Sequence, residues 1–152
     1  MAFTVVRNCP SCGKGNRIPA SHLADAGRCG ACKSALPALD EPLDVDDNAF
    51  SQIVAESTVP ILTDFWAAWC GPCRMAAPEV HLLAREMAGC ALVLKVNTEE
   101  SPQAAARFGV QSIPNFVVLR GGRLVFQQAG LVPRAEMRRW LEAAQGSNEP
   151  NR

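Results

Sequence analysis

The sequence predicts an α/β protein in which a mixed central sheet carries helices on both faces, with a small cysteine-rich segment in front. Two observations favour this fold class. Short apolar runs alternate with helical patterns from about residue 42 onward, and a Gly-Gly turn between the last two runs indicates a hairpin. Residues 1–39 differ, because they combine few large apolar side chains with many turn-forming glycines and prolines.

The first helix of the α/β part is expected after Asp46 or Asp47, since either carboxylate can accept hydrogen bonds from the free N–H groups of a helix start. Residues 59–66 form a short apolar run and predict a buried strand. Residues 70–88 have apolar side chains at helical spacing and predict the next helix.

The second half continues the alternation. Residues 91–96 predict another buried strand, and residues 101–107 predict a short helix with a proline at its first position. Residues 116–119 and 124–126 are the two arms of the hairpin, and the final helix is expected from Val132 onward. With a first strand ahead of the helix at Asp46 or Asp47, to which no residues are assigned, the predicted order of elements is βαβαβαββα.

The chain has 152 residues, of which 48% are hydrophobic, so its length allows one ordinary core. Its 15 basic and 15 acidic residues cancel, although residues 1–40 carry five basic and two acidic residues. This balance gives no reason to expect nucleic acid as a partner, and no apolar stretch approaches the length of a membrane span. We expect a monomer with a metal-binding segment over residues 1–39, a domain over residues 42–146 and a flexible tail over residues 147–152.

No secretory signal peptide is visible, because Cys9 lies too close to the start for an apolar h-region to precede it. We therefore expect the protein in the cytoplasm, a reducing compartment in which structural disulfides are rare. Seven cysteines in such a chain are typical of metal binding or catalysis.

Two Cys-x-x-Cys pairs, Cys9/Cys12 and Cys29/Cys32, are separated by 16 residues near the N-terminus. This spacing falls within the range of four-cysteine zinc sites, and two residues between ligands allow one tight turn to aim two sulfurs at one point. A segment without a core of its own needs such a crosslink, because metal binding then supplies its folding energy. We predict one Zn²⁺ held by all four cysteines, and a surface position for His22 between the pairs.

Alternatives for these cysteines are two redox pairs, two disulfides, or iron in place of zinc, since a tetrahedron of four sulfurs suits both metals. The segment resembles the zinc ribbon family, whose knuckles often have the pattern Cys-Pro-x-Cys-Gly that occupies residues 9–13.

The third pair, Cys70/Cys73, lies at the junction between an apolar run and a predicted helix. The free N–H groups and the dipole of a helix N-terminus favour an anion, so the thiolate of Cys70, which is the reactive form, should be stabilised. Pro72 suits the first helical turn, where its missing N–H costs nothing. Cys73 lies one helical turn deeper and close enough to form a disulfide with Cys70. We therefore expect Cys70 to attack a disulfide and Cys73 to resolve the mixed disulfide that results.

The residues around this pair form the run Asp-Phe-Trp-Ala-Ala-Trp-Cys-Gly-Pro-Cys-Arg from Asp64 to Arg74, and the positions that follow it are Pro78, Lys95 to Asn97, Ile113-Pro114 and Gly130. The run resembles the active-site segment of the thioredoxin family, and the later positions continue the match in the family's order and spacing over about residues 42–145. With the zinc ribbon in front, the chain resembles the bacterial thioredoxin-2 type. The resemblance implies a thioredoxin fold and a protein-disulfide reductase.

The resemblance also implies the roles of the catalytic residues. Cys70 is the nucleophile that forms a mixed disulfide with the substrate, and Cys73 then releases the reduced product. Asp64 corresponds to the family's buried aspartate, which takes the Cys73 proton, and Lys95 corresponds to its neighbouring lysine. The redox poise is tuned by the two residues between the cysteines, Gly71 and Pro72.

For substrate binding, the resemblance implies a shallow apolar groove. Pro114 corresponds to the family's cis-proline, which faces the dithiol, keeps metals away from it and leaves the backbone of Ile113 free to pair with an extended substrate strand. Trp69 and Gly130 are the other residues implied to line this groove.

The implied partners are disulfide-containing proteins and a thioredoxin reductase that uses NADPH to recharge the dithiol, while no organic cofactor is expected on the chain itself.

Two other functions are compatible with the cysteines. An oxidant or isomerase has the same fold, although those relatives usually carry a bulkier or basic residue between the cysteines. The four-cysteine segment is also compatible with a zinc-dependent interaction or sensing module, in which oxidation ejects the metal.

Other residues receive structural interpretations. His81 is expected on a solvated helix face. Cys90 directly precedes an apolar run, so we expect a buried small hydrophobe, with a regulatory thiol as the alternative. The aromatic residues assigned to the core are Phe65, Trp66, Phe116 and Trp140.

Overall fold

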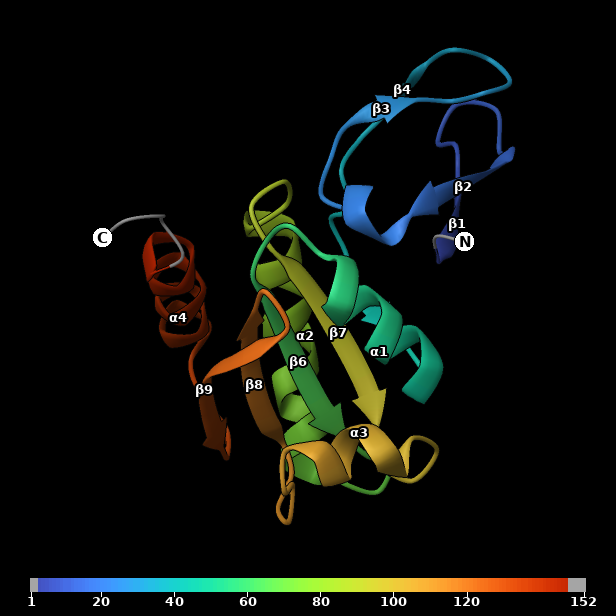
Figure 1. Ribbon diagram of the computed structural model, residues 1–152. Coiled ribbons are helices and arrows are strands. Elements are labelled where there is room, and N and C mark those ends of the chain that lie inside the picture. The colour runs from blue at the N-terminus through green and yellow to red at the C-terminus, as the bar shows by residue number, and fades with distance from the viewer. Residues whose placement is uncertain (1–2, 148–152) are drawn as a thin grey trace.

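The structure is a computed structural model that describes residues 3–147, and it has the predicted α/β architecture (Figure 1). The central sheet consists of β5 (Leu43–Asp44), β6 (Ile61–Trp66), β7 (Leu92–Asn97), β8 (Asn115–Arg120) and β9 (Arg123–Ala129). These strands lie in the order β5-β7-β6-β8-β9. β5, β7 and β6 run parallel, whereas β8 is antiparallel to β6, and β9 is antiparallel to β8.

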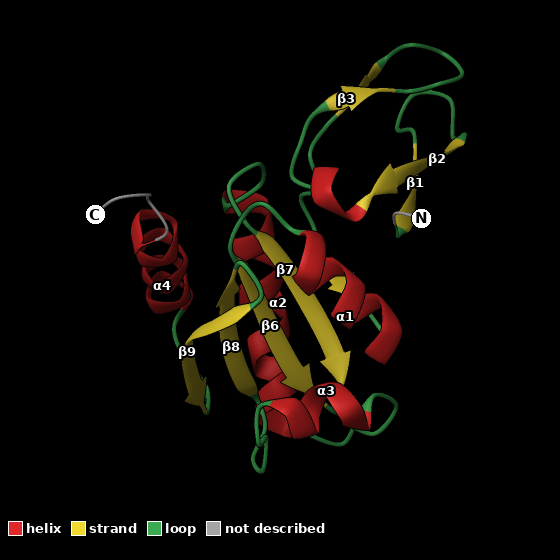
Figure 2. Cartoon of the chain, in the orientation of Figure 1, coloured by secondary structure: helices red, strands yellow, loops and turns green. Residues whose placement is uncertain are grey.

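Within the described residues, four α-helices cover the two faces of this sheet, and the order of elements confirms the predicted βαβαβαββα (Figure 2). The helices are α1 (Asp47–Glu56), α2 (Gly71–Glu86), α3 (Pro102–Arg107) and α4 (Arg134–Ser147). Phe50 of α1 and Ala104 of α3 belong to one apolar cluster, and Val80 of α2 and Leu141 of α4 belong to a second cluster on the opposite face. Because both faces are covered, β6 and β8 are almost wholly buried, which explains their continuous apolar sequences.

The two aspartates at the start of α1 have different tasks. The carboxylate of Asp46 caps α1, because its Oδ1 accepts a hydrogen bond of 2.8 Å from the N–H of Ala49. The carboxylate of Asp47 reaches instead to the start of α3, where its two oxygens accept hydrogen bonds from the N–H groups of Gln103 (3.2 Å) and Ala104 (2.7 Å). Asp47 therefore ties α1 to α3.

The N-terminal segment consists of two short hairpins joined by one turn of 3-10 helix. β1 (Thr4–Asn8) pairs with β2 (Gly15–Pro19), the turn η1 (Ala20–His22) follows, and β3 (Gly27–Arg28) pairs with β4 (Ala35–Leu36). Each hairpin carries one of the two Cys-x-x-Cys pairs in its loop.

This segment is packed on the α/β domain, which the sequence analysis did not predict. Ala20, Leu23 and Leu39 belong to the same apolar cluster as Ile53 of α1. Leu39 also donates a backbone hydrogen bond of 3.0 Å to the carbonyl of Leu23. Apolar packing therefore attaches this segment to the domain, and the attachment does not depend on metal binding alone.

Ser147, the first residue of the predicted tail, is the last residue of α4, and residues 148–152 lie outside the described part of the chain. Within residues 3–147, no helix combines the length and the apolar character needed to cross a bilayer.

Replacing Asp47 by alanine should lower the free energy of unfolding by about 1–2 kcal/mol, because two N–H groups of α3 lose a charged acceptor. Urea unfolding followed by circular dichroism measures this change. The matched control is Gln52→Ala at an exposed position of the same helix. Equal midpoints for the two variants would show that Asp47 does not stabilise the link between α1 and α3.

Candidate active site and metal centre

The pair Cys70/Cys73 lies at the corner where β6 ends and α2 begins. Cys70 is the N-cap of α2, and its Sγ accepts a hydrogen bond of 3.2 Å from the N–H of Cys73. A sulfur thus takes the place that a serine or aspartate oxygen usually has at a helix start. The two cysteines form a disulfide with a Cα–Cα distance of 5.2 Å, and both are almost fully buried.

The segment opposite this pair contains the predicted cis-proline. The Ile113–Pro114 peptide bond is cis, as the resemblance implied, and the carbonyl oxygen of Ile113 lies 3.7 Å from the Sγ of Cys70. The N–H of Gly130 donates a hydrogen bond of 2.8 Å to the carbonyl of Pro114. Gly130 has a φ of 97°, which side-chain-bearing residues rarely adopt. The structure therefore brings Ile113, Pro114 and Gly130 together beside the disulfide.

Trp69 lies on the outside of the same corner and is 66% exposed, in contrast to the buried cysteine that follows it. Its indole N–H donates a hydrogen bond of 2.7 Å to a carboxylate oxygen of Glu99. Glu99 was not predicted as a site residue, since it lies 30 positions from Trp69 in a turn with no distinguishing motif. A large apolar side chain is thereby held at the protein surface next to the dithiol.

Asp64 is buried in β6, with only 1% of its surface exposed. Alternation along the strand places it on the same face as Leu62, which packs in the apolar cluster beneath α2. Across the sheet it is in register with Lys95 on β7. Within the described residues, neither carboxylate oxygen of Asp64 has a hydrogen-bond partner.

Burial raises the pKa of Asp64 from its ordinary value of 3.8 to about 7. The positive charge of Lys95 opposes this change, and the negative charge of Asp44 adds to it. Nothing in the sequence singles out Asp44 for this arrangement. Asp44 is next to Lys95 in the parallel register of β5 and β7, so Lys95 lies between two carboxylates.

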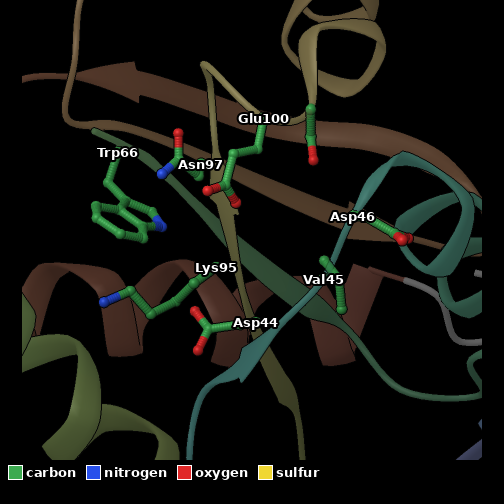
Figure 3. A pocket seen from close by; sticks show the side chains of 8 residues that line it. Asp44, Val45, Asp46, Trp66, Lys95, Asn97 and Glu100 are labelled. Carbon is green, nitrogen blue, oxygen red and sulfur yellow. The ribbon is translucent and has the colours of Figure 1, made fainter. Parts of the chain in front are cut away.

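A cavity of about 330 Å³ opens beside this row of charged residues (Figure 3). Figure 3 shows Lys95 running past Asp44 toward Trp66, and the Lys95 Nζ lies 5.0 Å from the centre of the Trp66 ring. The cavity wall is polar and carries both signs of charge. It is formed by Asp44, Val45, Asp46, Trp66, Lys95, Asn97, Glu100 and Ser101.

The four N-terminal cysteines form a second, separate cluster, in which all four Sγ atoms lie within 4.8 Å of one another. The Sγ–Sγ distances are 3.7 Å for Cys9–Cys32 and 3.7 Å for Cys12–Cys29. A tetrahedral zinc site with Zn–S bonds of about 2.3 Å requires sulfurs about 3.8 Å apart. The donor set and its spacing therefore fit one zinc ion.

The two knuckles have equivalent backbone geometry. The N–H of Cys9 donates to the carbonyl of Lys14 (2.9 Å), and that of Cys29 donates to the carbonyl of Ser34 (2.9 Å). The N–H groups of Ser11 and Ala31 each lie 3.3 Å from the first sulfur of their knuckle. The residue directly after the second cysteine has a positive φ in both knuckles, at Gly13 (79°) and Lys33 (68°).

Backbone N–H groups also prepare one ligand for metal. The N–H groups of Cys32 and Ala31, followed by the side-chain amide of Asn16, lower the pKa of the Cys29 thiol to about 6. Zinc binds the thiolate form, so this sulfur is available near neutral pH.

The two cysteine sites lie at opposite ends of α2. Cys70 caps the start of the helix, whereas Gly89, just beyond its end, faces the N-terminal segment, since a Cβ at that position would lie 3.9 Å from the carbonyl of Ala24. Sixteen residues of α2 span about 24 Å at 1.5 Å per residue. Figure 1 shows the N-terminal hairpins beyond the end of the domain at which α2 finishes.

Several interpretations of single residues need correction. Cys90 is exposed, because it belongs to the turn that precedes β7, and burial begins only at Ala91. Trp66 and Trp140 are only partly buried, because Trp66 lines the cavity and Trp140 stacks on Phe126 at a ring distance of 4.7 Å.

The remaining interpretations are confirmed. Phe65 and Phe116 are fully buried, and His81 is exposed. His22 is also at the surface, where its Nδ1 lies 2.7 Å from a carboxylate oxygen of Asp25.

Comparison with known proteins agrees with this geometry. The thioredoxin family model matches residues 41–143, and the model described as Thioredoxin 2, N-terminal, matches residues 8–34. Thioredoxin C-3 of Corynebacterium nephridii is 37% identical over 134 residues, which cover 88% of this chain and 91% of that protein. Thioredoxin 1 of Nostoc sp. is 47% identical over 98 residues, which cover 64% of this chain and 92% of that protein.

A solved structure of a mutant thioredoxin from Halobacterium salinarum superposes with a TM-score of 0.64 at 31% sequence identity, covering 70% of this chain and 92% of that one. The fold and the paired cysteines thus define a thiol-disulfide oxidoreductase, of the protein-disulfide reductase kind, that carries a zinc ribbon. The chain belongs to the thioredoxin family, and its N-terminal segment is the ribbon of the thioredoxin-2 type.

The raised pKa of Asp64 makes the stability of the protein depend on pH. Because the folded state binds the carboxyl proton more tightly than the unfolded state, this contribution is complete below pH 3.8 and is lost as the pH rises through about 7. Replacing Asp64 by asparagine should therefore stabilise the fold by roughly 2–4 kcal/mol at pH 8 and have little effect near pH 4.

Urea unfolding of both proteins across this pH range measures the difference. Glu56→Gln, which removes a partly exposed carboxylate, is the control. A stability difference between wild type and Asp64→Asn that does not grow with pH would contradict the assignment of a raised pKa to this buried group.

Proposed function

We propose that this chain reduces disulfides in other proteins by cycling Cys70 and Cys73 between dithiol and disulfide, and that an NADPH-dependent thioredoxin reductase returns it to the dithiol. The observation that carries the proposal is the position of Cys70 as the sulfur cap of α2, directly after the strand that carries the buried carboxyl of Asp64. At this position the thiolate is stabilised by the N–H groups and dipole of the helix.

The reaction proceeds in two exchanges. The Cys70 thiolate attacks one sulfur of the substrate disulfide, forms a mixed disulfide and releases the other substrate sulfur as a thiolate. The sulfur of Cys73 then attacks the Sγ of Cys70, which breaks the mixed disulfide, releases the second substrate thiolate and leaves the Cys70–Cys73 disulfide. Two electrons thereby pass from the protein to the substrate, and the reductase restores them from NADPH.

Cys73 must lose its proton before the second exchange, and Asp64 is the base that we assign to this step. A carboxyl whose pKa lies at about 7 is well matched to proton transfer near neutral pH. Lys95 adjusts this pKa and also lines the polar cavity of Figure 3. We propose that the proton reaches the solvent along this side of the sheet.

The substrate binds as an extended segment beside Pro114. The carbonyl of Ile113 lies next to the reacting sulfur, so the backbone at this position is suited to pair with a substrate strand. Trp69 supplies exposed apolar surface on one side, and Gly130 leaves the other side open because it has no side chain. Gly71 and Pro72 set the redox poise from the first turn of α2.

For the ribbon we propose one Zn²⁺ held by Cys9, Cys12, Cys29 and Cys32. When bound, the ion supplies a tetrahedral crosslink between the two hairpins. We assign it a structural role, because the ribbon lies at the end of α2 that is remote from the dithiol. We retain residues 1–39 as the ribbon, residues 42–146 as the thioredoxin domain, and a monomer in the cytoplasm as part of the same proposal.

The reductase activity is tested by insulin reduction with NADPH and a thioredoxin reductase. Cys70→Ser should lower turnover by roughly three orders of magnitude, because the nucleophile is removed. Cys73→Ser should stop turnover while a mixed disulfide with Cys70 accumulates, which mass spectrometry detects. Cys90→Ser, at an exposed cysteine outside the site, is the control and should retain full activity.

Substantial turnover by Cys70→Ser would rule out the proposed nucleophile. An equilibrium with glutathione that favours the Cys70–Cys73 disulfide only under strongly oxidising conditions would instead support an oxidant or isomerase.

Removal of zinc tests the structural role of the ribbon. A strong chelator should release one zinc per chain, expose the four ribbon cysteines to alkylation and lower the melting temperature, while the rate of insulin reduction at 25 °C stays within about twofold. Loss of reductase activity in proportion to zinc release would show that the two sites communicate and would support the sensing module in place of a structural ribbon.

A further inference from the structure

Asn16 connects the two knuckles of the ribbon through a single side-chain amide. Its Oδ1 accepts a hydrogen bond of 2.9 Å from the N–H of Gly30 in the second knuckle. Its Nδ2 donates to the carbonyl of Lys14 at 3.1 Å and points at the Sγ of Cys29 at 3.6 Å. One amide therefore contacts the backbone of both knuckles and one of the four sulfurs.

The role of this amide follows from a difference between the knuckles at the residue after the first cysteine. The residue after the first cysteine is Pro10 in the first knuckle and Gly30 in the second. Proline has no N–H, whereas the N–H of Gly30 needs an acceptor. Asn16 supplies that acceptor from the first knuckle, so the unequal pair Pro10/Gly30 is what makes a cross-link between the knuckles possible.

Only an amide meets all three contacts. Asparagine carries one acceptor oxygen and one NH₂ donor on the same planar group. An aspartate would still accept from Gly30, but it would offer no donor to Lys14 or Cys29 and would place a negative charge beside the ligand sulfurs. Asn16 is also partly buried, whereas both of its neighbours, Gly15 and Arg17, are exposed.

We propose that Asn16 is a positioning residue of the metal centre, which fixes the second knuckle against the first and orients the sulfur of Cys29. It does not bind the metal itself. The inference rests on the proposed binding of one metal ion by the four cysteines. By holding two ligands of each knuckle at tetrahedral spacing, Asn16 lowers the cost of ordering the site when metal binds.

Zinc affinity of the full-length protein, measured by competition with a chromophoric chelator, tests this role. Asn16→Ala should weaken zinc binding by about 10- to 100-fold, and Asn16→Asp should weaken it at least as much. Arg17→Ala, at the next residue of β2, is the matched control and should bind like the wild type. Insulin reduction should be the same for all four proteins, because the dithiol lies at the other end of α2.

A second pair of variants separates a specific hydrogen bond from a general weakening of the ribbon. Gly30→Pro copies the first knuckle and removes the N–H that donates to the Oδ1 of Asn16. Adding Asn16→Ala to this variant should therefore lower the zinc affinity much less than Asn16→Ala lowers it in the wild type. Gly30→Ala keeps the N–H, and its Cβ would lie 3.6 Å from the Asn16 oxygen in ordinary contact, so the full cost should remain.

The absorption spectrum of the cobalt-loaded protein provides the structural readout. Saturated Asn16→Ala should retain the tetrahedral four-thiolate spectrum of the wild type and lose only affinity. Affinities of Asn16→Ala and Arg17→Ala that agree within about twofold would overturn the inference while leaving the metal site intact. A wild-type chain that takes up neither zinc nor cobalt would overturn the proposed metal site and this inference together.

Discussion

The chemistry of the dithiol depends on one interaction, the hydrogen bond from the N–H of Cys73 to the sulfur of Cys70 at the start of α2. A helix start has free N–H groups that need an acceptor, and here the acceptor is the reactive group itself. The neighbouring elements meet at that sulfur. β6, which carries the buried Asp64, leads to it, and the loop before β8 brings the carbonyl of Ile113 to within 3.7 Å of it. In the proposed reaction, the contact that caps the helix also stabilises the Cys70 thiolate.

The same Cys-x-x-Cys spacing has a different meaning at the other end of α2, because the surroundings differ. In the ribbon, two knuckles face each other, and N–H groups within each turn point at their first sulfurs. No long helix begins at these cysteines, and four sulfurs meet where the dithiol has two. Asn16 then joins the knuckles. The length of α2, about 24 Å, keeps the two sulfur chemistries apart, while Leu23 and Leu39 fasten the ribbon to the domain through apolar contact.

The sequence was sufficient for the order of elements, because strands buried on both faces appear as apolar runs and each helix start carries a recognisable residue. It also located the corner at Cys70 and the four ribbon cysteines. It could not predict contacts between residues that lie far apart in the chain and carry no motif, such as Asp47 with α3, Glu99 with Trp69, or Asp44 with Lys95. Cys90 was wrongly expected in the core, because hydrophobic pattern alone does not fix where a turn ends and a strand begins.

The surroundings of each cysteine, and not the Cys-x-x-Cys spacing, determine its chemistry, and one measurement compares all seven thiols in one molecule. The reduced, zinc-loaded protein is treated briefly with an alkylating reagent at slightly acidic pH, and mass spectrometry gives the rate at each cysteine. We expect Cys70 to react much faster than the exposed thiol of Cys90. We expect Cys12 and Cys32, although exposed, to react only after a chelator removes the metal. Equal rates for Cys70 and Cys90, or rapid reaction of Cys12 and Cys32 with zinc still bound, would contradict this dependence on the surroundings.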